Sequence, residues 1–143
     1  MIAQTLSKFQ APALTLLRTM TGFLFFPHGA QKLFGLFGGF GGQPGATAPL
    51  FSLMGAAGIL EFFGGLLVMF GLFTRPIAFI LSGLMAAAYF MGHFPQGFWP
   101  LLNRGELAAL YSFVFLFLAA SGGGAFSIDG MLFNGKRCRH RTA

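Results

Sequence analysis

Five ionisable side chains stand within or beside strongly apolar stretches of this 143-residue sequence. They are His28, Lys32, Glu61, His93 and Glu106. Imidazole and carboxylate groups can exchange protons, and an ammonium group can donate hydrogen bonds to a carbonyl oxygen. A charge at the centre of a bilayer costs roughly 2.5–3.5 kcal/mol, so such groups usually face other helices or a polar cavity. We therefore predict that these five residues line one polar pocket.

The first apolar stretch carries a polar stripe. On an ideal helix, an arc of about 80° contains Arg18, Thr21, Phe25, His28 and Lys32. Pro27 can kink this helix, which makes the alignment approximate beyond it. The rise of about 1.5 Å per residue places His28 and Lys32 about 6 Å apart along the axis, close enough to serve one small headgroup.

Glu61 is the one charge in the second apolar stretch, LFSLMGAAGILEFFGGLLVMFGLF, and lies near its middle. It is surrounded at helical spacing by the small residues Ala57, Gly58, Gly64 and Gly65. Small residues let a neighbouring backbone approach closely. Glu61 can therefore be a structural partner for Arg18 or Lys32, or a functional carboxylate, and the two interpretations can coexist.

His93 ends the third apolar stretch, and the segment NRGE opens the fourth with Arg104 and Glu106. We expect these three residues to share a leaflet with His28 and Lys32, although they are far apart in the sequence. This convergence is the strongest functional signal that the residues give by themselves. The alternative is interfacial anchoring, because basic residues at helix ends commonly extend toward the lipid headgroups.

Metal, haem and nucleic acid are disfavoured as ligands. Histidines on two helices could ligate haem, copper or zinc, but their spacing establishes no ligand set, and the lone Cys138 excludes a CxxC pair. The net charge of +6 does not indicate nucleic acid, because four of the nine basic residues crowd into the C-terminal KRCRHRTA. We predict no metal site and no nucleic-acid partner.

The elements that must position these residues are four apolar spans, each about 20 residues long as a bilayer requires. The predicted spans are residues 12–35, 50–73, 76–94 and 106–126. Hydrophobic residues make up 55% of the chain and charged residues 8%, which suits lipid better than water. We predict an all-α integral membrane four-helix bundle over residues 1–130, followed by a basic tail at residues 131–143.

The orientation follows from the basic residues. Six lie on the side of both termini, and only Lys32 and Arg104 lie on the other side, with the intramembrane Arg18 left out of the count. Cytoplasmic loops carry an excess of Lys and Arg. We therefore predict that both termini are cytoplasmic and that the protein lies in the inner, or plasma, membrane.

The chain resembles the DoxX family of small four-span membrane proteins over about residues 18–130. The resemblance rests on RTMTGFLFFPHGAQKLFG, ILEFFGGLLVMFGLFTR, MAAAYFMGHF, NRGELAALY and GGGAFSIDG, in this order and at this spacing. It implies a membrane component with redox or oxidative-stress functions. Some relatives, of the DoxD type, are associated with oxidation of thiosulfate and transfer of electrons to quinone.

The resemblance also carries over a set of positions without giving them individual catalytic roles. These are Arg18, His28, Gly29, Lys32, Glu61, Gly65, His93, Glu106 and Asp129. Among the charged residues outside the five pocket candidates, we interpret Arg18, Arg104 and Asp129 as structural charge partners. A pocket with aromatic walls and a few polar groups suits a quinone headgroup, whose carbonyl oxygens accept hydrogen bonds from Lys or His.

Three functions remain open at this point, and so does the question whether the protein is an enzyme. The leading hypothesis is a quinone-associated membrane subunit of an oxidoreductase, active in oxidative stress or sulfur-compound oxidation. The second is a noncatalytic scaffold or assembly factor for a soluble redox enzyme. A transporter comes third, because four spans leave little room for alternating access. The expected partners are the lipid bilayer, a soluble redox enzyme and a second copy of the chain.

Overall fold

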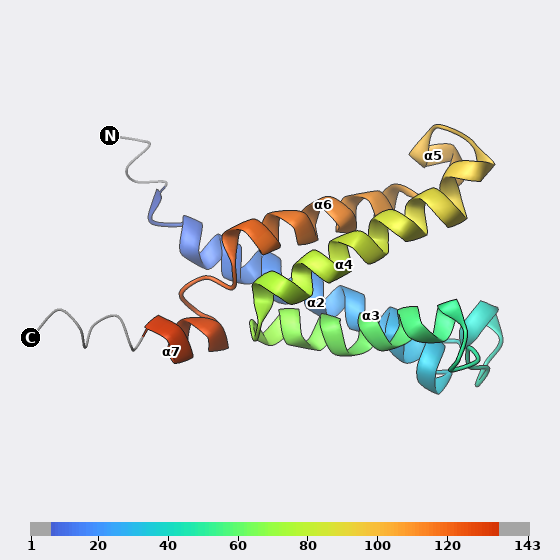
Figure 1. The fold of residues 1–143 in the computed structure, drawn as a ribbon, viewed down its shortest axis with the longest axis horizontal. Helices are drawn as coiled ribbons and strands as arrows, with labels where there is room; N and C mark the ends of the chain where they lie inside the picture. The colour runs from blue at the N-terminus through green and yellow to red at the C-terminus, as the bar shows by residue number, and fades with distance from the viewer. Residues whose placement is uncertain (1–6, 135–143) are drawn as a thin grey trace, which may run out of the picture.

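The computed structural model describes residues 7–134, and every regular element in this range is helical. Four long helices run along the length of the molecule: α2 (Gln10–Phe34), α3 (Leu53–Phe70), α4 (Thr74–Ala88) and α6 (Glu106–Ser121) (Figure 1). The short elements are η1 (Phe40–Gly42), η2 (Tyr89–His93), η3 (Phe94–Gln96), α5 (Pro100–Asn103) and α7 (Ile128–Asn134). The start of α2 and the short α7 lie at the same end of the bundle, as an even number of long helices requires.

Two of the long elements are long and apolar enough to cross a membrane. These are α3 and the continuous segment Thr74–Gln96, which joins α4 to η2 and η3. The third apolar helix, α6, has 16 residues and ends at Ser121. The predicted fourth span, 106–126, extends beyond this helix, because Gly122 adopts a positive φ of 81° and the helix stops there.

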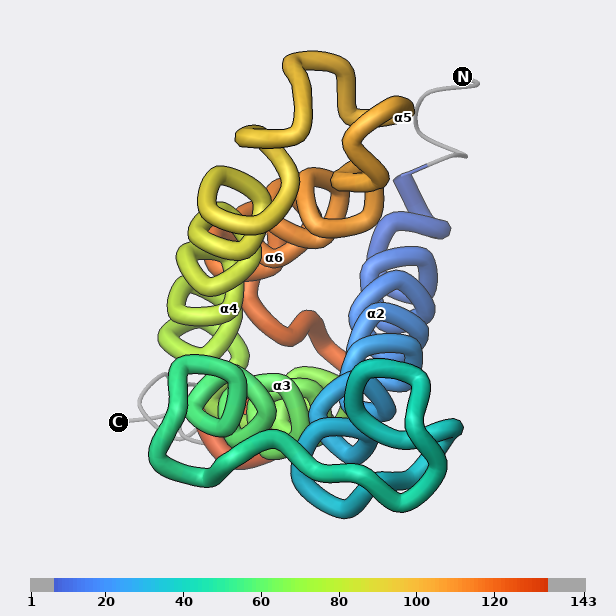
Figure 2. Tube along the Cα trace, turned by 90° about the vertical axis from the view of Figure 1, so that its right-hand side faces the viewer, coloured from blue at the N-terminus to red at the C-terminus, as the bar shows by residue number. Residues whose placement is uncertain are grey.

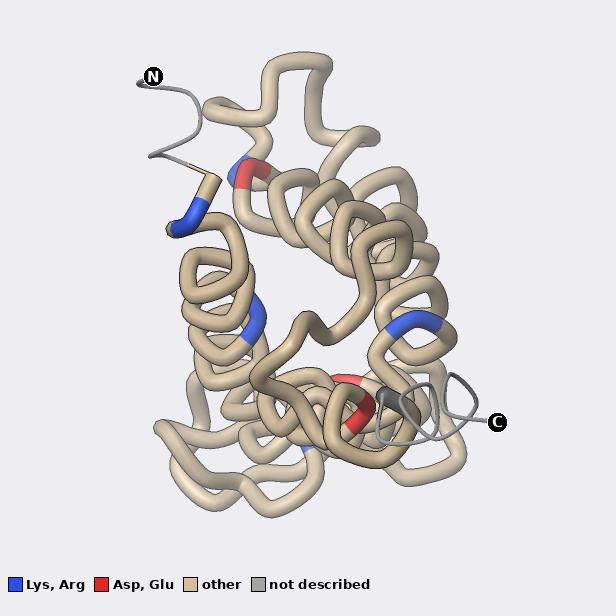
Figure 3. The backbone as a smooth tube through the Cα atoms, turned by 90° about the vertical axis from the view of Figure 1, so that its left-hand side faces the viewer, with Lys and Arg blue, Asp and Glu red and all other residues tan. Residues whose placement is uncertain are grey.

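The surface of the bundle is apolar along every long helix. Exposed large side chains include Phe23, Phe63, Phe79 and Phe113, whereas Phe25, Leu81 and Phe115 belong to a small buried core. Charged residues occupy few positions along the backbone (Figure 3). Soluble monomers rarely expose apolar surface on this scale, and a helical bundle surrounded by lipid does.

The helices associate as two pairs, α2 with α3 and α4 with α6. Figure 2 looks along the bundle from the end that carries α5. Between α4 and α6, each hydroxyl of Ser82 and Ser112 donates to the backbone carbonyl of the other residue, at 2.8 and 3.1 Å. Between the pairs, α2 meets α6 chiefly through Phe25, whose ring packs edge-on against Tyr111 and Phe115.

Glycines set the close approach of α2 and α3. A Cβ atom at Gly22 would lie 2.5 Å from the carbonyl oxygen of Gly65, and one at Gly65 would lie 2.8 Å from the backbone nitrogen of Phe26. Neither position leaves room for a larger side chain, so the two backbones touch directly. This contact, which also includes Gly29 and Gly58, fixes the register between α2 and α3.

The connections at the α5 end of the bundle are ordered by hydrogen bonds. After α2 ends at Gly35, which has a φ of 66°, the glycine-rich loop folds back so that the amide of Ala48 donates to the carbonyl oxygen of Lys32 at 2.8 Å. On the other pair, α4 continues into the π-helix η2. The loop that follows η2 is held by Asn103, which is 1% exposed.

The domain boundary predicted at residue 130 falls inside α7. Of the predicted basic tail, residues 135–143 lie outside the described part of the chain, and Cys138 is among them. The predicted orientation of the termini relative to the cytoplasm stays a prediction.

Candidate functional site

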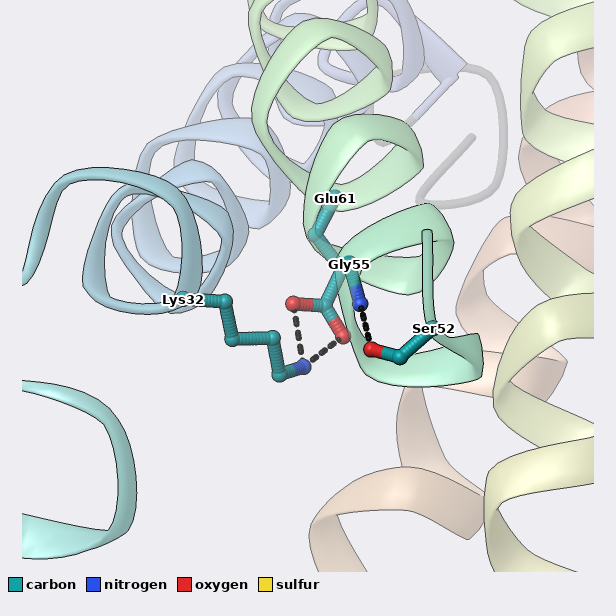
Figure 4. A network of polar contacts seen from close by, with 4 residues as sticks. All are labelled: Lys32, Ser52, Gly55 and Glu61. Carbon is teal, nitrogen blue, oxygen red and sulfur yellow. Dashed lines mark hydrogen bonds and ion pairs between the residues drawn. The ribbon is translucent and has the colours of Figure 1, made fainter. Parts of the chain in front are cut away.

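Lys32 and Glu61 form the one ion pair among residues 7–134. The Nζ atom of Lys32 on α2 donates to both carboxylate oxygens of Glu61 on α3, each at 2.5 Å (Figure 4). The Glu61 side chain is 5% exposed and that of Lys32 is 19% exposed. At the start of the same helix, the hydroxyl of Ser52 caps α3 by accepting from the amide of Gly55 at 3.1 Å.

The glycine contact between α2 and α3 explains why the pair forms. Gly58 faces the Cβ atom of Lys32, and Gly29 lies against the backbone of Gly58 and Phe62. A larger side chain at Gly29 or Gly58 would move the helices apart. The close approach therefore lets the side chain of Lys32 reach Glu61, one turn beyond Gly58.

The ion pair forms part of the wall of a cavity of about 270 Å³ between the two helix pairs. The polar lining consists of His28, Lys32, Glu61, His93 and Arg104. The apolar lining consists of Phe25, Met85, Ala88, Leu107, Ala108 and Tyr111. Four of the five predicted pocket residues thus lie around one space, although they come from three different segments of the chain.

His93 enters the cavity wall from the π-helix η2. Its Nδ1 atom lies 3.0 Å from the carbonyl oxygen of Asn103. A carbonyl oxygen can only accept, so Nδ1 carries a proton, and in the neutral ring Nε2 remains able to accept one. The His93 ring also stacks on Tyr89 at 6.5 Å between centroids. Single π-helical turns are frequent at functional sites, where they redirect a side chain.

Several polar groups at the cavity keep hydrogen-bonding capacity. Lys32 has three N–H donors and uses two of them on Glu61. The imidazole of His28 has no hydrogen-bond partner within the described residues, and this side chain is exposed at the cavity rim. Arg104, also exposed, has a left-handed φ of 59°. The cavity can therefore offer donors to a ligand without first breaking the ion pair.

Glu106 is the predicted pocket residue that the structure does not bring to the cavity. It is exposed and lies in an outer groove with Leu101, Arg104 and Leu110. Sequence reasoning also missed Met85 and Tyr111 as cavity walls. A signal for Tyr111 was present, because it follows Leu107 and Ala108 at helical spacing and faces the polar stripe of α2.

A second polar centre lies at the α7 end of the bundle, around Arg18, which is 2% exposed. The guanidinium donates to four backbone carbonyl oxygens: Val68 at 2.8 Å, Met69 at 2.5 Å, Gly123 at 3.1 Å and Phe126 at 3.0 Å. It thus satisfies carbonyls in the last turn of α3 and ties the segment after α6 to α2. Of the two partners considered for Glu61, the structure selects Lys32 and not Arg18.

Asp129 completes this second centre. Its carboxylate accepts from the amides of Phe73 and Thr74, each at 2.8 Å, and so caps the start of α4 from a distant part of the sequence. The carboxylate also interacts electrostatically with the Arg18 guanidinium. We call Arg18 and Asp129 with these backbone partners the Arg18 clamp.

No group of three or more potential metal ligands is present within the range that the structure covers, residues 7–134. The cavity instead combines a neutralised ion pair, two imidazoles and an aromatic wall. Such a surface can bind a small polar headgroup, donate hydrogen bonds to it and exchange protons with it.

Comparison with known proteins identifies relatives over most of the chain. A sequence profile of the DoxX family matches residues 13–94. An uncharacterized protein of Haemophilus influenzae is 40% identical over 131 residues, which cover 90% of this chain and 96% of that protein.

Two relatives carry more specific names. Inner membrane protein YqjF of Escherichia coli is 40% identical over 93 residues, 64% of this chain and 65% of that protein. A Bacillus subtilis protein named "Putative oxidoreductase CatD" is 30% identical over 124 residues, 85% of this chain and 88% of that protein. No solved structure matches.

Proposed function

The chain belongs to the DoxX family, and from this premise we propose that it is a membrane subunit of a redox system whose cavity binds a quinone headgroup. The observation that carries this proposal is the Lys32–Glu61 ion pair at an aromatic-walled cavity, with one lysine donor left over. Support comes also from the relative whose name calls it an oxidoreductase.

The membrane part of the proposal is a four-span arrangement of α2, α3, α4 with its extension, and α6. It is supported by the two helices of sufficient length and apolarity, by the exposed phenylalanines, and by the relative named as an inner membrane protein. In this arrangement α2 crosses with Arg18 and Lys32 turned inward. The cavity then lies toward the outer leaflet if the termini are cytoplasmic.

At Lys32 itself, the ion pair favours a neutral ligand over an anion. Glu61 neutralises Lys32, so the remaining N–H of Lys32 acts as a hydrogen-bond donor and adds little net charge. A quinone carbonyl oxygen is a neutral acceptor of this kind. Phe25 and Tyr111 supply the flat apolar surface on which a ring can pack.

In this proposal Lys32 and His28 hold the acceptor oxygen, and Nε2 of His93 exchanges protons with it. Glu61 holds the Lys32 side chain in place. Reduction of a quinone to a quinol takes up two electrons and two protons. The electrons come from a donor protein, for which the sequence predicts a soluble redox enzyme.

The test is quinone binding to purified protein in lipid nanodiscs, with a decyl-substituted benzoquinone as the probe. Lys32→Met and His28→Ala should each weaken binding, because each removes a polar group from the cavity. Lys8→Met, at an exposed lysine outside the cavity, is the matched control. Unchanged binding in both cavity variants, with the fold confirmed by circular dichroism, would reject a quinone site here.

The scaffold function is the second candidate, and one observation favours it. Arg18 and Asp129 hold the segment after α6, and this segment leads into the basic tail. A tail anchored in this way could present its charges to a soluble enzyme or to anionic lipid. Stable copurification of a partner enzyme, with no retained quinone and no quinone-dependent turnover, would favour the scaffold.

A further inference from the structure

The two helix pairs separate toward the α5 end of the bundle, and the cavity lies where they separate. Figure 1 shows α4 and α6 diverging from α2 and α3 away from α7. Near the middle, Phe25 bridges the pairs at 5.1 Å from Tyr111 and 4.8 Å from Phe115, measured between ring centroids. These rings close the inner end of the cavity.

Two matching stripes face each other across the cavity. On α2 the lining residues are Phe25, His28 and Lys32, and on α6 they are Leu107, Ala108 and Tyr111. Each stripe follows the three- and four-residue spacing of one helix face. The backbones of α2 and α6 approach each other at few positions, and the cavity lies between these stripes.

The exposed lining residues show on which side the cavity opens. They are His28 on α2, Arg104 just before α6, and Leu107 on α6, whose side chain is 50% exposed. The residues that α3 and α4 contribute, Glu61 and Met85 among them, are buried or half-buried. The opening therefore lies between α2 and α6, on the side of the bundle.

On the basis of the proposed quinone site, we propose that this opening, which is bordered by His28, Arg104 and Leu107 and narrowed by the half-buried Ala108, is a lateral portal to the bilayer. The ring enters through it and reaches Lys32, while the alkyl tail stays in lipid between α2 and α6. A ligand with a long apolar tail gains nothing from an exit into water, and the apolar rim residue Leu107 lies beside the acyl chains.

Ala108 sets the size of the portal. Its methyl group is half-buried in the cavity wall, at the level where α2 and α6 are separated. A phenylalanine there would occupy part of the 270 Å³ and narrow the passage between the stripes. Ala108→Phe should therefore weaken binding of the decyl benzoquinone about tenfold or more, and that of a two-ring naphthoquinone further. Ala120→Phe, exposed on the same helix and outside the cavity, should leave both unchanged.

The deciding experiment is photolabelling of the unaltered protein in nanodiscs. The probe is a decyl benzoquinone with a diazirine on the first carbons of its tail, and excess unlabelled decyl benzoquinone is the competitor. The labelled residues are located by mass spectrometry. We expect competitor-sensitive labels on α2 around His28 and on α6 around Leu107, and loss of these labels in Ala108→Phe but not in Ala120→Phe.

Two other outcomes distinguish failure of the proposed portal from failure of the proposed quinone site. Competitor-sensitive labels confined to α3 and α4 would overturn the portal and leave the quinone site standing. Absence of any competitor-sensitive label would contradict the quinone site itself, and the portal with it. Because labelling of the unaltered chain decides between these outcomes, the test does not depend on the folding of Ala108→Phe.

Discussion

The two polar centres of this bundle use similar charged groups in opposite ways. In the Arg18 clamp, the guanidinium donates to backbone carbonyls and the Asp129 carboxylate accepts from backbone amides, all at helix ends or in a loop. In the Lys32–Glu61 pair, side chain meets side chain beside a cavity, and one lysine donor is left over.

This difference separates charges that hold the fold from charges that are available to a ligand. A buried charge is tolerated when hydrogen bonds satisfy it, and backbone carbonyls satisfy Arg18 almost completely. Lys32 uses two of its three donors on a side chain, and its neighbours at the cavity are the imidazoles of His28, on the same helix, and of His93, on η2. We therefore assign stability to the Arg18 clamp and ligand binding to the Lys32–Glu61 pair.

The largest expected effect comes from removing the centre of the Arg18 clamp. Arg18→Met removes the guanidinium donor from four carbonyl oxygens, of which that of Val68 keeps the amide of Gly71, and frees the segment after α6, so we expect a loss of about 3–5 kcal/mol in unfolding free energy. Detergent melting measures this loss. Arg75→Gln is the control, because Arg75 also donates to backbone carbonyls but is exposed, and it should cost about 1 kcal/mol or less. Equal melting of both variants would show that the Arg18 clamp does not hold the fold.

The next effect concerns the acidic partner of Lys32. Glu61→Gln should destabilise the bundle by about 1–3 kcal/mol, because it leaves the Lys32 charge without its counter-ion. Glu106→Gln, at an exposed carboxylate outside the cavity, should melt like the unaltered protein. Near-identical, unaltered melting in both variants would show that Glu61 is not a required counter-ion.

An effect of similar size tests the glycine contact on which the ion pair depends. Gly29→Ala places a methyl group against the backbone of Gly58 and Phe62, so we expect a loss of about 1–3 kcal/mol. Gly83→Ala meets no atom within 4 Å and should gain up to about 1 kcal/mol from helix propensity. The comparison is again thermal melting. A stabilising Gly29→Ala would mean that α2 and α3 are not held at backbone contact.

Much of the candidate site could be predicted from the sequence, because it depends on helix periodicity. The stripe through His28 and Lys32 and the small residues around Glu61 are visible in the spacing alone. The partner of Glu61 was not determined, since Arg18 and Lys32 share one helix face. Only the register between α2 and α3, fixed by Gly22 and its contacts, decides between them.

The remaining differences come from backbone details that apolar patterning does not encode. Arg104 adopts a left-handed conformation just before α6, and Glu106 in the first turn of α6 lies outside the cavity. Gly122 ends α6 five residues before the predicted limit at residue 126, where the composition stays apolar. In each case a local backbone conformation outweighs the apolar pattern.

The most direct test of the central claim separates stability from binding in one protein, the double variant Lys32→Met with Glu61→Gln. Removing both charges of a buried pair leaves neither one without its counter-ion, so the double variant should lose much less stability than a variant that removes only one of them. We therefore predict melting near that of the unaltered protein, together with loss of decyl benzoquinone binding in nanodiscs. Retained binding at unaltered affinity in this folded variant would contradict the claim that the Lys32–Glu61 pair forms the ligand site.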